Sequence, residues 1–197
     1  YEPYGVVLIM APWNYPFLLS LDPVIGAVAA GNCVIVKPSA YSPATSDIIK
    51  VIIEEVFEPE NGAVVLGGRA ENAALLEQEF DYIFFTGSTA VGHVVMQAAS
   101  KYLTPISLEL GGKSPCIVDE TASIDLAAKR IVWGKFLNAG QTCIAPDYIY
   151  AHASIKDELI AAMKRYIVQF YGEHPLQNSD LPRIVNEKHF ARLKGLV

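Results

Sequence analysis

Short apolar runs rich in β-branched residues alternate with helical patterns along the first half of the chain. Four of these runs predict buried strands, at Gly5–Met10, Cys33–Lys37, Ala63–Leu66 and Asp81–Thr86. The segments between and after them have helical spacing, at Leu18–Ala30, Ala44–Phe57, Ala70–Phe80 and about Thr89–Tyr102. Continuous apolar strands separated by helices are typical of a parallel sheet covered on both faces. The sequence therefore predicts an α/β fold with an open, mostly parallel, twisted sheet flanked by helices.

A glycine-rich segment interrupts this pattern after a further strand at Ile106–Leu110. Beyond it the sequence predicts a strand, a helix, a strand and a helix, at Cys116–Asp119, Ile124–Leu137, Tyr148–Ala151 and Ile155–Tyr171. Because adjacent glycines let the backbone bend freely, we expect a domain hinge near Gly111-Gly112. We therefore divide the chain into residues 1–110 and residues 111–197, and the second part begins another α/β domain.

The composition excludes several classes of protein. Hydrophobic residues make up 52% of the chain and charged residues 18%, which supplies a large core and excludes a disordered chain. The net charge is −6 and no dense basic run occurs, so we expect no nucleic-acid partner. The most apolar stretch, from Pro16 to Val36, is interrupted by charged, proline and glycine residues and does not predict a membrane span.

The cysteines indicate a reducing compartment and one candidate nucleophile. Cys33, Cys116 and Cys143 lie far apart without a CxxC pair, which argues against a disulfide framework and favours the cytoplasm. No metal-ligand cluster stands out, so we expect no metal. Cys33 and Cys116 lie in apolar strands, where cysteine packs as a small hydrophobic residue. Cys143 lies in a predicted loop, where it is either a nucleophile with a lowered pKa or an ordinary loop cysteine.

A glycine turn between a strand and a helix offers an anion site at Gly87-Ser88. The segment from Gly87 to Gly92 has the two glycines of a phosphate-binding loop, but His93 stands where that loop requires lysine. Gly112-Lys113-Ser114 has the ending of such a loop, but Ser107 stands where its first glycine is required. No GxGxxG occurs either, so the turn either presents free backbone N–H groups to an anion or is simply a tight turn.

Three polar residues end or follow predicted strands. Glu109 lies near the end of the apolar strand Ile106–Leu110 and is either a general base in a cleft or a solvated carboxylate. Asn14 lies between two prolines and either donates to an oxyanion or forms a turn or helix cap. Lys37 ends a strand at the edge where parallel sheets bind ligands, although most lysines are simply solvated.

Taken in order, five motifs resemble those of the aldehyde dehydrogenase superfamily. They are Pro12-Trp13-Asn14, Lys37-Pro38-Ser39, Phe85-Thr86-Gly87-Ser88-Thr89, Glu109-Leu110-Gly111-Gly112-Lys113-Ser114 and Gly140-Gln141-Thr142-Cys143. The resemblance covers nearly the whole chain, from about Glu2 onward. Two further segments, Trp133-Gly134-Lys135-Phe136 and Cys143-Ile144-Ala145-Pro146-Asp147-Tyr148, resemble the class 3, fatty-aldehyde branch.

The resemblance implies NAD(P)-dependent oxidation of an aldehyde to a carboxylic acid. Cys143 would attack the aldehyde carbon, and the Asn14 amide and the Cys143 backbone N–H would hold the oxyanion. After hydride transfer, Glu109 would activate the water that hydrolyses the thioester. The implied architecture is a Rossmann-like cofactor domain at residues 1–110, followed by a catalytic domain at residues 111–197.

The resemblance also implies a site for NAD or NADP, with Lys37 at the adenosine ribose and Gly87 and Ser88 along the pyrophosphate. Ala40 departs from the family, since many members carry a glutamate there that holds the ribose hydroxyls. Without that carboxylate a 2′-phosphate meets less repulsion, so we hypothesise dual cofactor use. Tyr15 would line the aldehyde entrance, and the other implied cofactor residues are Met10, Ala11, Pro12, Trp13 and Leu110.

Family enzymes are much longer than 197 residues, and this chain starts at Tyr1 and ends in a helical pattern. We therefore expect an internal fragment of a longer enzyme, with little or no dehydrogenase activity in isolation. The family habit implies a homodimer for the longer enzyme. The substrate implied by the class 3 resemblance is a medium-chain or long-chain aliphatic aldehyde or an aromatic aldehyde.

Three other interpretations compete with this one. Acylating members of the superfamily pass the thioester to coenzyme A or phosphate and usually lack the glutamate that Glu109 matches. The second is a non-catalytic nucleotide-binding fragment or pseudoenzyme: the intact set of Cys143, Glu109 and Asn14 argues against a pseudoenzyme, whereas the expected cut at both ends of the chain favours a fragment. A thiol hydrolase needs a histidine base, and the four histidines lie in no recognisable motif, at positions His93, His152, His174 and His189.

Overall fold

The computed structural model describes residues 2–196. The chain folds into two compact units, Tyr1–Gly111 and Gly112–Val197. The hinge expected at Gly111-Gly112 coincides with this division. The assignment of the two parts as cofactor-binding and catalytic domains stays a prediction.

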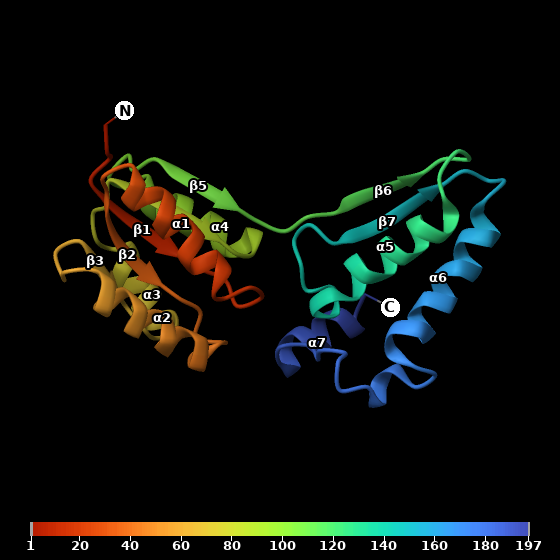
Figure 1. Ribbon diagram of the computed structural model, residues 1–197. Coiled ribbons are helices and arrows are strands. Elements are labelled where there is room, and N and C mark those ends of the chain that lie inside the picture. The colour runs from red at the N-terminus through yellow and green to blue at the C-terminus, as the bar shows by residue number, and fades with distance from the viewer. Residues whose placement is uncertain (1, 197) are drawn as a thin grey trace. The chain divides into compact units, whose positions relative to one another are not determined.

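The first unit contains a five-stranded parallel sheet in the order β3-β2-β1-β4-β5 (Figure 1). Its strands are β1 (Val6–Met10), β2 (Cys33–Lys37), β3 (Gly62–Val64), β4 (Tyr82–Thr86) and β5 (Ile106–Glu109). The helices that connect them are α1 (Leu18–Ala29), α2 (Pro43–Val56), α3 (Arg69–Leu76) and α4 (Thr89–Ala99). The predicted α/β fold with a helix-flanked parallel sheet is confirmed.

Alternate residues of β1 enter two separate cores, because successive side chains of a strand point to opposite faces. Val7 and Ile9 pack with residues of β2, α1 and α2, among them Val24, Val34, Val36, Ile49 and Ile53. Leu8 and Met10 pack on the other face with residues of α3 and α4, among them Leu75, Leu76, Val95 and Ala99. Helices α1 and α2 therefore cover one face of the sheet, and α3 and α4 cover the other.

The second unit begins with a two-stranded parallel sheet formed by β6 (Ser114–Val118) and β7 (Pro146–Ala151). Helices α5 (Ile124–Phe136) and α6 (Lys156–Tyr171) pack together with these strands in a single core. Asp125 of α5 accepts a 2.6 Å hydrogen bond from the Tyr166 hydroxyl of α6 and pairs with Arg165. The Tyr166 hydrogen bond, reinforced by Arg165, holds the pKa of Asp125 below its usual value.

Several element boundaries differ from the sequence expectation. Helix α3 ends at Leu76 rather than at residue 80, because the chain turns so that Phe80 enters the core beneath the sheet. Helix α4 ends at Ala99, and Leu103 beyond it adopts a positive φ of 56°. The two 3₁₀ turns η1 (Leu137–Gly140) and η2 (Pro175–Gln177) were not predicted, and the helical pattern expected at the end of the chain forms helix α7 (Glu187–Lys194).

Within residues 2–196, none of the helices is both long enough and apolar enough to cross a membrane.

Ile49 and Ile48 are neighbours on α2 that test the importance of this core. The side chain of Ile49 is 0% exposed in the core of the first unit, whereas that of Ile48 is 54% exposed. We expect Ile49→Ala to lower the free energy of unfolding by about 2–5 kcal/mol, because it removes buried methyl groups and leaves a cavity. Ile48→Ala should change it by less than about 1 kcal/mol. Urea denaturation followed by circular dichroism measures both, and equal losses would contradict the assigned core.

Candidate active site

The carboxyl ends of the central strands form the candidate cofactor edge of the first unit. The strands β2 and β3 lie on one side of β1, and β4 and β5 lie on the other, so the strand order switches sides between β1 and β4. Open α/β sheets bind ligands in the crevice at such a switch point. Met10, the last residue of β1, is paired with both Lys37 and Phe85. The predicted segment from Met10 to Tyr15 therefore leaves the sheet between the end of β2 and the end of β4.

The Gly87-Ser88 turn follows β4 at this edge and opens helix α4. The Ser88 hydroxyl accepts a 3.4 Å hydrogen bond from the backbone N–H of Val91, so Ser88 caps the helix. A side chain at position 87 would press against the ring of Phe85, which explains the glycine there. The result is a helix N-terminus with a close-approaching backbone, an arrangement that favours a phosphate group.

Lys37 is only 3% exposed at the end of β2. Its ammonium group donates hydrogen bonds to the carbonyl oxygens of Pro38 at 2.8 Å and Gly67 at 2.7 Å. Burial lowers the pKa of Lys37, and the nearby Glu71 carboxylate partly offsets that effect. The alternative that Lys37 is an ordinary solvated lysine is therefore wrong, because the side chain is buried and two carbonyl groups fix it at the sheet edge.

Asn14 lies half-buried in the segment between β1 and α1. The N-cap of α1 is Phe17, so Asn14 does not cap that helix. The backbone beyond Asn14 is held by two hydrogen bonds, from Leu19 N–H to the Tyr15 carbonyl at 2.9 Å and from the Ser20 hydroxyl to the Pro16 carbonyl at 2.6 Å. Asn14 thus belongs to a defined segment rather than to a loose loop.

Glu109 is the exposed last residue of β5. Its carbonyl accepts a 2.9 Å hydrogen bond from Gly87 N–H, so its backbone is fixed beside the phosphate-type turn. Leu110, the next residue, packs against the core beneath α4. Within the first unit Glu109 is therefore exposed, as expected for the solvated carboxylate that was one of the two sequence alternatives. Its role as a general base stays a prediction.

Cys143 lies half-buried in the second unit, in the loop between η1 and β7. Three consecutive residues before it have positive φ angles, namely 52° at Asn138, 53° at Ala139 and 74° at Gly140. Only glycine adopts this left-handed region without steric cost, and asparagine tolerates it better than alanine does. The sequence predicted a loop here, but Ala139 gave no signal of a left-handed turn.

The backbone of Gly112 approaches this loop closely. A β-carbon at position 112 would overlap the backbone carbonyl oxygen of Cys143. Of the other two cysteines, Cys116 packs against the core of the second unit, in agreement with its predicted packing role. The Cys33 sulfur lies 3.9 Å from the Asn61 side-chain oxygen.

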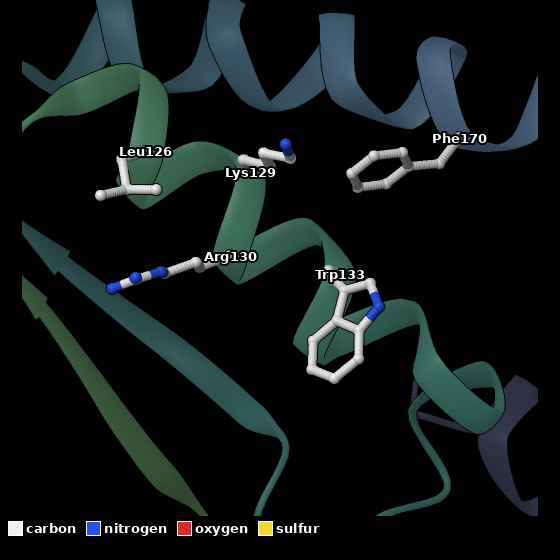
Figure 2. A pocket seen from close by; sticks show the side chains of 5 residues that line it. All are labelled: Leu126, Lys129, Arg130, Trp133 and Phe170. Carbon is white, nitrogen blue, oxygen red and sulfur yellow. The ribbon is translucent and has the colours of Figure 1, made fainter.

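Asn14 and Glu109 belong to the first unit and Cys143 to the second. No sequence pattern predicted the contacts of Gln141, whose side chain bonds to Asn138 in the cysteine loop and to Val185 in the segment before α7. A cavity of about 370 Å³ on the surface of α5 and α6, shown in Figure 2, was likewise not predicted from the sequence. That cavity is lined by Leu126, Lys129, Arg130, Trp133 and Phe170.

Comparison with known proteins identifies the family. The model of the aldehyde dehydrogenase family matches residues 1–197. The chain is 51% identical over 196 residues to the dimeric, NADP-preferring aldehyde dehydrogenase of Rattus norvegicus, covering 100% of this chain and 43% of that protein. It is 54% identical over 196 residues to the 4,4′-diaponeurosporen-aldehyde dehydrogenase of Staphylococcus aureus, with coverage of 100% and 43%.

A solved structure agrees with the sequence comparison. The Mycobacterium tuberculosis aldehyde dehydrogenase complexed with NAD⁺ superposes with a TM-score of 0.89 and 32% identity, covering 99% of this chain and 41% of that one. The chain thus spans less than half the length of the proteins that it matches. Since the family model matches every residue from 1 to 197, the chain belongs to the aldehyde dehydrogenase family.

Proposed function

We propose that this chain carries the nucleophile, the general base and an oxyanion donor of an NAD(P)-dependent enzyme that oxidises an aldehyde to a carboxylic acid. The observation that carries the proposal is the position of Cys143. It is the cysteine that lies in a loop of defined geometry, three residues after the left-handed Gly140, within a chain that belongs to the aldehyde dehydrogenase family.

The chemistry follows from the groups that this chain supplies. The Cys143 thiolate attacks the aldehyde carbon, and the carbonyl oxygen becomes an oxyanion held by the Asn14 amide and the Cys143 backbone N–H. A nicotinamide cofactor, when bound, accepts the hydride and so leaves a thioester on Cys143. Glu109 then takes a proton from water, the hydroxide attacks the thioester carbon, and the Cys143 thiolate leaves with the carboxylic acid released.

The cofactor edge described above fits a dinucleotide. A phosphate group suits the N-terminus of α4 at Gly87-Ser88, where the backbone can approach closely. Lys37 supplies a fixed cation at the next strand end, which suits the adenosine ribose. Met10, Ala11, Pro12, Trp13 and Leu110 complete the proposed cofactor set, and Tyr15 would contact the aldehyde.

The names of the relatives suggest the substrate, the cofactor and the assembly. The Staphylococcus relative is named for a 4,4′-diaponeurosporen-aldehyde, and the rat relative is called dimeric and NADP-preferring. We propose for the whole protein an apolar aliphatic or aromatic aldehyde, use of NAD or NADP, a homodimer and a cytoplasmic location. Acylation of coenzyme A is the rival reaction, and Glu109 favours water as the acceptor instead.

Replacing the proposed nucleophile is the direct test. Cys143→Ser in the full-length protein should reduce NAD(P)H formation from an aliphatic aldehyde to background, because serine at this site has a much higher pKa than cysteine. The matched control is Cys116→Ser, which alters a packing residue and should keep most of the activity. An active Cys143→Ser enzyme would rule out the thioester route.

Replacing the proposed base separates the two half-reactions. Glu109→Gln should form about one NAD(P)H per site in a rapid burst and then turn over at least about a hundredfold more slowly, because the thioester forms but hydrolyses slowly. Stopped-flow absorbance at 340 nm measures the burst, and intact mass detects the trapped acyl group. Unchanged steady-state turnover of Glu109→Gln would show that Glu109 is not the base. If the native enzyme turned over only when coenzyme A was added, the acylating reaction would be favoured.

Ala40 tests the cofactor preference. It is exposed and follows Lys37 by three residues, so a carboxylate there would face a 2′-phosphate. We expect Ala40→Glu to raise the KM for NADP by about tenfold or more while leaving the KM for NAD within about twofold. Ala29→Glu adds the same charge at the far end of α1 and serves as the control. Equal effects of both changes on NADP would refute the local role of position 40.

A further inference from the structure

The side chain of Gln141 joins the Cys143 loop to the segment that precedes α7. Its amide nitrogen donates to the carbonyl of Asn138 at 3.0 Å and to the carbonyl of Arg183 at 3.2 Å. Its amide oxygen accepts a 3.0 Å hydrogen bond from the backbone N–H of Val185. The amide nitrogen thus bonds both its own loop and a segment more than forty residues away, and the amide oxygen bonds that same distant segment.

The partner segment is itself well fixed. The Arg183 guanidinium donates to the carbonyls of Leu181 at 2.8 Å and Leu176 at 2.7 Å. Asn186 caps α7 by accepting a 2.9 Å hydrogen bond from His189 N–H. Gln141 is therefore bonded to a braced turn rather than to a loose strand of chain.

Apolar packing alone does not hold the loop against this segment. A cavity of about 240 Å³ lies between them, lined by Lys135, Phe136, Ala139, Leu181 and Pro182. This pocket is open to solvent, so the side chains that line it are not closely packed against one another. The hydrogen bonds of Gln141 bridge the two segments directly.

The loop also needs an external restraint because its backbone is strained. Ala139 has a φ of 53°, and a residue with a β-carbon in this region costs about 1–2 kcal/mol. Left-handed residues of this kind persist only where surrounding contacts enforce them. Gly112 lies close against the Cys143 carbonyl, and the hydrogen bonds of Gln141 tie the loop to the segment before α7.

We propose that Gln141 is a positioning residue, which holds the Cys143 sulfur and backbone N–H in the geometry needed for attack and oxyanion binding. This proposal rests on the proposed function, in which Cys143 is the nucleophile. Gln141 itself touches no reacting atom and acts through the backbone of Thr142, the one residue that separates it from Cys143. Its effect should fall on the covalent step rather than on cofactor binding.

Gln141→Met in the full-length enzyme tests this role, since methionine has a similar volume but makes none of the three hydrogen bonds. We expect kcat to fall by about tenfold to a hundredfold, as for other small misplacements of reacting groups, while the KM for NAD(P) changes by less than about threefold. The rate at which iodoacetamide alkylates Cys143, measured by peptide mass spectrometry, should fall, and its dependence on pH should differ from that of the native enzyme. Gln177→Met, on an exposed glutamine of η2, should leave kcat and alkylation unchanged.

Gln141→Glu provides a second variant if the methionine enzyme does not fold. Glutamate keeps the acceptor for Val185 N–H but loses both donated bonds, and we expect the same selective loss of kcat. Native kcat and native Cys143 alkylation in a folded Gln141 variant, with Cys143→Ser inactive, would overturn the positioning role alone. An active Cys143→Ser enzyme would instead overturn the proposed function on which it rests.

Discussion

The pairing of β1 with strands on both of its sides is the constraint on which the first unit depends. In-register parallel pairing places Met10 beside both Lys37 and Phe85, so β1 and β2 end at the same level and β4 ends one residue beyond it. Because the same strand sends alternate side chains into two cores, neither helix layer can shift without disturbing the other. The precise level of the strand ends is what sets the positions of the residues that follow them.

The second unit meets a different physical demand. Its core of β6, β7, α5 and α6 is ordinary, but the nucleophile loop leaves that core through three left-handed residues. Such a path is unfavourable for the chain alone and is stabilised by specific contacts, one through a glycine and one through an amide side chain. The first unit thus positions its proposed groups through strand ends, whereas the second positions Cys143 through loop restraints.

Periodicity predicted most of the fold, because buried parallel strands and their covering helices repeat a strong apolar pattern. It placed β2 at its observed bounds and β1 and β4 within one residue, whereas α3 and α4 end at Leu76 and Ala99, before the predicted ends at Phe80 and about Tyr102. Helix α7 was recognised only as a helical pattern at the end of the chain, without bounds, and none of its residues is buried.

The candidate site was predictable only as far as single motifs carry chemical meaning. Cys143, Glu109, Asn14 and Lys37 stood out by their residue type and by their place at strand ends or in a loop. The burial of Lys37 and the contacts of Gln141 depend on carbonyl groups distant in the sequence, at Gly67 and Arg183. Contacts to backbone groups leave no signal in residue types, so only the structure reveals them.

The contact between Gly112 and the Cys143 carbonyl makes two motifs interdependent. Gly112 belongs to the segment that starts at Glu109, while Cys143 ends the segment that starts at Gly140. Changes at positions that share such a contact are not additive in their effects. A cysteine loop transplanted from another member of the family would therefore have to bring a matching backbone at position 112 with it, so the two motifs form one inheritable unit although thirty residues separate Gly112 from Cys143.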